Sequence, residues 1–123
     1  MKFLKFVVAA LIAVFATTSL AACSSEPTVD VSSYAAVIDV RTVEEWNQGY
    51  LEGAVRMGIA DPDFTTQLAT LDPSQDYYIY CRSGNRAGQA IDIMRQAGFT
   101  GELINGGSVA NASGQTGLAV VKP

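Results

Sequence analysis

The chain contains no histidine among its 123 residues. Histidine is the base in Cys–His and Ser–His–Asp catalysis and a frequent ligand of zinc. Its absence therefore excludes those catalytic arrangements and the common zinc sites. It also leaves Ser83 without a base that could make its hydroxyl a nucleophile. We expect no metal and no cofactor.

Cysteine is also scarce, since the chain has only two. The first, Cys23, ends the sequence Leu-Ala-Ala-Cys after a lysine-containing start and an apolar stretch at 6–15 that is short for a membrane span. This pattern predicts a secretory signal peptide at 1–22 with a bacterial lipobox, in which Cys23 is lipidated. The protein would then be lipid-anchored in the bacterial cell envelope, on the extracytoplasmic side. An ordinary secretory signal or an uncleaved anchor would be the alternatives.

Positive charge is sparse as well. The chain has 8 basic and 12 acidic residues, and removal of 1–22 would take away two lysines and no acid, leaving 6 against 12. A net charge of −6 argues against nucleic acid as a partner and against electrostatic adhesion to anionic lipid. Two of the six remaining basic residues, Arg82 and Arg86, lie within one six-residue segment. This concentration of positive charge indicates a binding site for a small anion.

Short β-rich runs alternate with helix-patterned segments. Strands are expected at 36–40, 53–57, 77–80 and 102–104, and helices at 42–48, 63–69 and 85–97. This alternation favours an α/β fold with a mostly parallel sheet and helices on both faces. We expect the domain to span 34–123, after a flexible tether at 23–33, and the tail from Ser108 to form a short helix or loop.

Two helix boundaries carry specific signals. Thr42 is followed three residues later by Glu45, which is the pattern of a capping box. Gly98 suits the left-handed position after a helix end, where Phe99 could pack on Met94 in a Schellman arrangement.

The second cysteine, Cys81, opens the segment Cys-Arg-Ser-Gly-Asn-Arg at 81–86, between an expected strand and an expected helix. Backbone N–H groups point outward at a helix start, and the helix dipole is positive there. These conditions favour a thiolate and make a cysteine nucleophilic. The alternative is an inert structural cysteine. We interpret Cys81 as the catalytic nucleophile.

The neighbours of Cys81 have matching roles. Gly84 allows the loop to curl, Ser83 or Asn85 could add a side-chain donor, and the two arginines could bind an anion. Arg86 could instead pair with an acid on the helix surface, and Arg82 could be a solvated charge.

The second strand end expected at this edge carries Asp39 and Arg41. We expect them to be structural, for example through a pair of Arg41 with Glu45. The aromatic residues Trp46, Tyr77, Tyr78 and Tyr80 are expected in the core or half-buried on the sheet.

Four segments, in order along the chain, resemble rhodanese-like domains. They are Ile38-Asp39-Val40-Arg41 with Glu45-Trp46, Gly49-Tyr50-Leu51-Glu52-Gly53-Ala54, Cys81 to Arg86, and Ile104-Asn105-Gly106-Gly107. The resemblance implies a rhodanese-like three-layer domain and a sulfurtransferase. Cys81 would accept a sulfane sulfur as a persulfide, residues 82–86 would bind the anionic sulfur, and a thiol or cyanide-like acceptor would remove it. Tyr50 and Glu52 depart from the family pattern, which often has His and Pro there.

Other functions remain open. A persulfide carrier or redox-sensing module would use the same cysteine without turnover. Phosphatases and arsenate reductases with a similar loop separate Cys and Arg by five residues, whereas four separate Cys81 from Arg86. The smaller ring favours a single sulfur over phosphate. The sequence does not predict the oligomeric state, the membrane leaflet or the physiological donor and acceptor.

Overall fold

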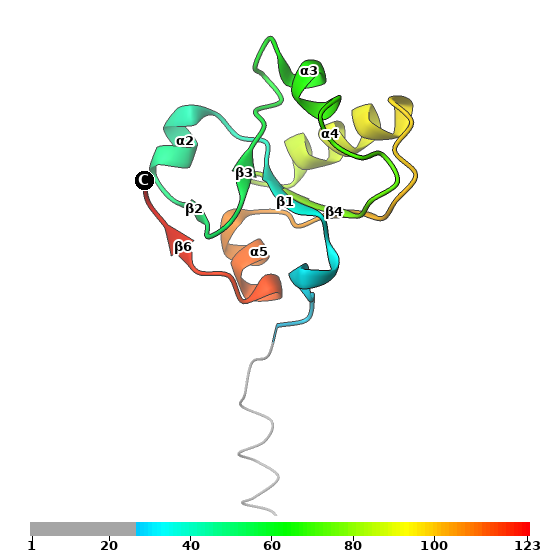
Figure 1. Ribbon diagram of the computed structural model, residues 1–123. Coiled ribbons are helices and arrows are strands. Elements are labelled where there is room, and N and C mark those ends of the chain that lie inside the picture. The colour runs from blue at the N-terminus through cyan, green and yellow to red at the C-terminus, as the bar shows by residue number, and fades with distance from the viewer. Residues whose placement is uncertain (1–26) are drawn as a thin grey trace, which may run out of the picture.

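The computed structural model describes residues 27–123 (Figure 1). The predicted signal peptide and Cys23 lie outside the described residues, so lipidation stays a prediction. Within 27–123, none of the helices has the length and apolar character that crossing a bilayer requires.

A four-stranded parallel sheet forms the centre of the domain, with the strand order β3-β1-β4-β5. The strands are β1 (Ala36–Asp39), β3 (Val55–Arg56), β4 (Tyr77–Tyr80) and β5 (Leu103–Asn105). All four residues of β4 are buried, as expected for a central strand of a covered parallel sheet. Because the strands are parallel, the residues that follow β1 and β4 lie at the same edge of the sheet.

Helices cover both faces of this sheet, which confirms the predicted three-layer α/β fold (Figure 1). The helices of the domain are η1 (Val31–Ser33), α2 (Val43–Asn47), α3 (Phe64–Leu68), α4 (Asn85–Gln96) and α5 (Val109–Thr116), and α2 buries no residue in either core. Side chains alternate across a strand, so Tyr77 and Ile79 join the core beneath α3 and α4, while Tyr78 and Tyr80 join the core beneath α5. These tyrosines are buried in the core, as predicted.

Both predicted helix boundaries are confirmed. Thr42 caps α2 in a capping box with Glu45. At the end of α4, the N–H of Phe99 donates to the carbonyl of Met94 (3.0 Å) and the N–H of Gly98 to that of Arg95 (3.1 Å), as in a Schellman motif. These caps fix the direction in which the chain enters α2 and leaves α4.

A second, two-stranded antiparallel sheet was not predicted. It pairs β2 (Tyr50–Leu51) with β6 (Val120–Val121). Two-residue strands are too short to show an alternating pattern, so sequence periodicity gives no signal for them. This small sheet brings the C-terminal segment beside the chain that follows α2.

The residues just before the predicted domain start also differ from expectation. The N–H groups of Thr28 and Val29 donate to the carbonyl of Gln115 in α5, both at 2.9 Å. Val29 and Val31 pack against the core on that face of the sheet. Packing of the domain therefore begins before residue 34, because Thr28, Val29 and Val31 of the expected tether contact it. The apolar side chains in an otherwise polar segment are the physical reason.

A close contact at Gly106 gives the first prediction. A methyl group at Gly106 would overlap the buried ring of Tyr78, whereas one at Gly114 in α5 meets no other atom within 4 Å. We expect Gly106→Ala to destabilise the fold by about 1–3 kcal/mol through overpacking. Gly114→Ala, a helix-interior change, should stabilise it by up to about 1 kcal/mol. Urea unfolding of the two variants measures both effects, and equal stabilities would contradict the close packing at Gly106.

Candidate functional site

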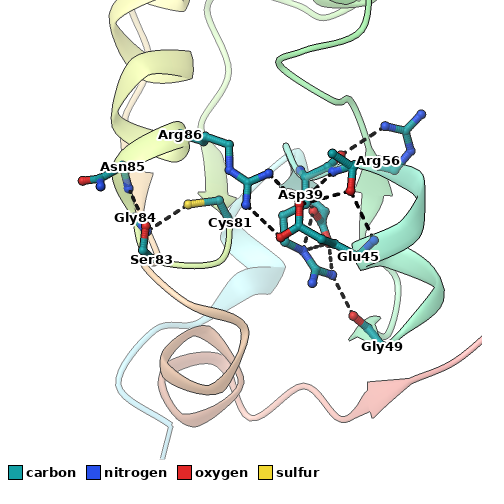
Figure 2. Close-up of polar contacts among 11 residues, drawn as sticks. Asp39, Glu45, Gly49, Arg56, Cys81, Ser83, Gly84, Asn85 and Arg86 are labelled. Carbon is teal, nitrogen blue, oxygen red and sulfur yellow. Dashed lines mark hydrogen bonds and ion pairs between the residues drawn. The ribbon is translucent and has the colours of Figure 1, made fainter.

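Cys81 follows β4 directly, at the carboxyl edge of the sheet (Figure 2). Its backbone N–H donates to the carbonyl of Gly107 (2.9 Å), which ties it to the loop after β5. Its side chain is fully buried and contacts the apolar core. However, Sγ is not surrounded only by hydrocarbon, because it accepts a hydrogen bond from the N–H of Gly84 at 2.9 Å. Cys81 forms no disulfide within residues 27–123.

The loop turns back over Sγ at Gly84, whose φ is +95°. An L side chain rarely adopts this conformation, so glycine is required for the turn. Gly84 is also the N-cap of the twelve-residue helix α4. The backbone N–H groups of Arg82, Ser83 and Arg86 have no acceptor among residues 27–123. Together with the helix start, they form a group of donors suited to an anion.

The side chains of Ser83 and Asn85 do not reach the sulfur. Both residues are exposed. The Ser83 hydroxyl accepts a long hydrogen bond of 3.5 Å from the N–H of Asn85, and neither side chain donates to Sγ. The donors nearest Cys81 therefore belong to the main chain. No group of three or more His, Cys, Asp or Glu side chains gathers within residues 27–123.

Arg86 is held in a bidentate ion pair with Glu45 of α2 (Figure 2). Nη1 lies 2.6 Å from Oε1, and Nη2 lies 2.8 Å from Oε2. The hydrogen bonds from Arg86 lower the pKa of Glu45 to about 2, and the carboxylate raises the pKa of Arg86 in return. Glu45 also accepts from the Thr42 backbone, so this one carboxylate joins the start of α2 to the start of α4. The pair fixes the first turn of α4, which carries the loop.

Asp39 and Arg41 form a separate, buried ion pair. Arg41 Nε donates to both carboxylate oxygens at 3.0 Å, and Nη2 lies 2.7 Å from Oδ2. Nη2 also donates to the carbonyl of Gly49 (2.7 Å), which holds the chain after α2. The suggested pair of Arg41 with Glu45 is therefore wrong. Asp39 is nearer along the strand end, and Glu45 is occupied by Arg86.

Within residues 27–123, three of the arginines at this edge of the sheet are paired with carboxylates, and one is not. Arg41 and Arg86 are paired as described, and Arg56 pairs with Asp61 at 2.9 Å. Arg82 is exposed and pairs with no carboxylate within residues 27–123. Of the two loop arginines, Arg82 is thus the one whose charge is not already neutralised by a protein carboxylate.

The partners of two residues at the site were not predicted from the sequence. Glu45 was expected to cap α2, but its pairing with Arg86 crosses 41 residues of sequence and left no local signal. Asn105 was given no role, yet its side chain bridges the loop at Gly84 and the turn at Gly107. The family motif containing Asn105 marks the segment, but the partners appear only in three dimensions.

The Glu45–Arg86 pair gives a pH prediction. Because the folded protein lowers the pKa of Glu45 from 4.5 to about 2, the ionised carboxylate stabilises the fold. This contribution, about 2 kcal/mol after allowance for partial solvent screening, is complete above pH 4.5 and is lost as pH falls towards 2. Glu45→Gln should lower stability at pH 7 and flatten the pH dependence in that window.

Urea unfolding between pH 2 and 7 measures this effect. Glu44→Gln is the matched control, since the exposed neighbouring carboxylate makes no ion pair within residues 27–123. Identical pH profiles for the two variants would show that the ion pair does not stabilise the protein.

Comparison with known proteins agrees with this geometry. The profile of the rhodanese-like domain family matches residues 20–111. A sulfurtransferase of Allochromatium vinosum is 33% identical over 89 residues, covering 71% of this chain and 78% of the relative. The thiosulfate sulfurtransferase PspE of Escherichia coli K12 is 29% identical over 85 residues, covering 69% and 75%.

Solved structures are similar as well. The Alr3790 protein from Anabaena superimposes with a TM-score of 0.61 at 27% identity, covering 74% of this chain and 70% of that one. A rhodanese with anions from E. coli gives a TM-score of 0.59 at 26% identity, covering 72% and 98%. A family match over most of the sequence, a relative of this similarity and the same fold lead to one conclusion: the chain belongs to the rhodanese-like domain family.

Proposed function

We propose that the protein is a sulfurtransferase that carries a sulfane sulfur on Cys81. In the first half-reaction the Cys81 thiolate attacks the outer sulfur of a donor such as thiosulfate. A new S–S bond forms, the S–S bond of thiosulfate breaks, and sulfite leaves with the electron pair. In the second half-reaction an acceptor such as cyanide attacks the outer sulfur, which gives thiocyanate and restores the thiolate. No external oxidant or reductant is needed.

The observation that carries this proposal is the hydrogen bond from the Gly84 N–H to Sγ at 2.9 Å. A buried cysteine that only fills space needs no donor directed at its sulfur. Here one amide already contacts Sγ, and other loop amides have no acceptor within residues 27–123. The outer sulfur of a persulfide is anionic, and preorganised amides would stabilise it strongly.

The burial of Cys81 sets a condition on the reaction. Its side chain has 0% exposure, so a donor reaches Sγ only if the loop moves. Arg82 and Ser83, which follow Cys81 in the loop, are exposed, and Arg82 forms no ion pair within residues 27–123, whereas Arg86 is held by Glu45. We therefore expect the outer part of the loop to open while the first turn of α4 stays in place.

We expect the two arginines of the loop to have different roles. Arg82, exposed and without a carboxylate partner among residues 27–123, is suited to attract the dianionic donor. Arg86 would act mainly through its structural pair with Glu45. This changes the emphasis of the sequence interpretation, in which both arginines were candidates to bind the anion and Arg86 was the stronger one. Relatives named thiosulfate sulfurtransferase support thiosulfate as the first donor to test.

Persulfide formation is the first prediction of this function. Incubation with thiosulfate should add the mass of one sulfur atom to the protein, and Cys81→Ser should gain none. Intact-mass spectrometry measures the change in a Cys23→Ser background, which leaves Cys81 as the remaining cysteine. Absence of the added sulfur in the parent protein would contradict the proposal.

Turnover separates an enzyme from a carrier. With thiosulfate and cyanide, an enzyme should release thiocyanate over many cycles with ping-pong kinetics. A persulfide that forms but is never transferred would instead indicate a carrier that needs a dedicated partner. Release of phosphate from a chromogenic ester, without persulfide formation, would indicate the hydrolase alternative.

Donor recognition by Arg82 is a separate prediction. Arg82→Ala should raise the KM for thiosulfate about three- to tenfold with a smaller effect on kcat, because an exposed charge contributes about 1 kcal/mol. Arg82→Lys should retain most of the affinity. Lys122→Ala removes the same charge near the C-terminus and serves as the control. An equal KM increase in both alanine variants would show that only net charge matters.

A further inference from the structure

Asn105 connects the cysteine loop to the turn that follows β5. Its Nδ2 donates to the carbonyl of Gly84 at 2.9 Å, and its Oδ1 accepts from the N–H of Gly107 at 2.9 Å. The amide group therefore spans two segments that are separated by more than twenty residues of sequence. In the motif Ile104-Asn105-Gly106-Gly107, Asn105 occupies the position that the family pattern leaves open.

Both partners of Asn105 are themselves bonded to Cys81. Gly84 donates its N–H to Sγ, and Gly107 accepts the N–H of Cys81 through its carbonyl at 2.9 Å. A closed set of hydrogen bonds results, from the Cys81 backbone through Gly107 and Asn105 to Gly84, and back to the sulfur. Asn105 is the only side chain in this set besides that of Cys81.

Asn105 contacts the cysteine loop at Gly84, a glycine at which the backbone turns. The carbonyl of Gly84 accepts from Asn105 and from the N–H of Gly88, which is the first hydrogen bond of α4. Gly84 has a φ of +95°, and as a glycine it has no side chain that could restrict rotation of its backbone. The helix bond and the bond from Asn105 both hold the Gly84–Asn85 peptide. The Gly84 N–H belongs to the preceding peptide, so this restraint reaches the N–H through the Cα of Gly84.

We propose that Asn105 is a positioning residue for sulfur transfer: by holding the Gly84 carbonyl, it keeps the Gly84 N–H directed at the sulfur of Cys81. This inference rests on the proposed function for its effect on turnover, but the effect on the Gly84 amide does not depend on it. Asn105 itself touches neither Sγ nor an expected substrate atom. Its chemistry is therefore orientation of the donor, not catalysis.

The test compares Asn105→Ala with Asn111→Ala. Asn111 is a matched control, because its Nδ2 donates to the carbonyl of Gly106 at 2.8 Å, one residue from Asn105, and its side chain forms no hydrogen bond with residues 81–86. Hydrogen exchange of the Gly84 amide, followed by NMR, should be about three- to tenfold faster in Asn105→Ala, as expected for loss of one hydrogen bond. Asn111→Ala should leave this rate within twofold of the parent protein.

Kinetics provide the second readout. Asn105→Ala should lower kcat for sulfur transfer about three- to tenfold and change the KM for thiosulfate by less than twofold, because Arg82 is untouched. Asn105→Asp keeps the acceptor for Gly107 but loses the donor to Gly84. It should reproduce the faster exchange, and it serves as the second variant if the alanine variant unfolds.

The outcomes are distinguishable. Unchanged exchange of the Gly84 amide in a folded Asn105→Asp protein would overturn the positioning role. A parent protein that forms no persulfide would overturn the proposed function, and the exchange data would still decide the role of Asn105. Equal exchange and kcat in the Asn105→Ala and Asn111→Ala proteins would reduce Asn105 to a residue that supports only the fold.

Discussion

The bidentate ion pair between Glu45 and Arg86 is the contact on which the geometry of the site depends. It joins α2, which follows β1, to α4, which follows β4. A parallel sheet places these two helix starts at one edge, but it does not fix the angle or depth at which each helix begins. The ion pair supplies that restraint and positions the first turn of α4. The N-terminal end of this helix is where the loop amides meet Cys81 (Figure 2).

Most arginines near the site have a structural role of the same kind. Arg41, Arg56 and Arg86 are neutralised by carboxylates and hold backbone segments in place. Charge that is buried or half-buried needs such partners, because desolvation penalises an isolated ion. Arg82 stays in solvent, where a free charge costs little. The structural arginines therefore build the edge of the sheet, and the exposed one is available to an incoming anion.

The loop around Cys81 combines a hydrogen-bonded base with an exposed outer part. Its base is held by main-chain bonds to Gly107 and by the Asn105 bridge to Gly84. Its outer residues, Arg82 and Ser83, are exposed and weakly bonded. The proposed sulfur transfer would need both properties, since the anionic sulfur must be shielded from water between reactions and yet meet a donor and an acceptor in turn. Burial of the thiol is compatible with this chemistry because a backbone N–H, that of Gly84, donates to its sulfur.

Local signals in the sequence determined the α/β fold, the capping box at Thr42, the helix end at Gly98 and the position of the cysteine loop. Each rests on hydrophobic periodicity or on residues within about six positions of one another. Only the tertiary structure decided that Glu45 pairs with Arg86 and not with Arg41, that Asn105 bridges two loops, and that Thr28 and Val29 bond to α5. Those contacts join residues that are distant in the chain, and several acceptors compete for each donor. The packing of the whole domain selects among them, and no local pattern contains that information.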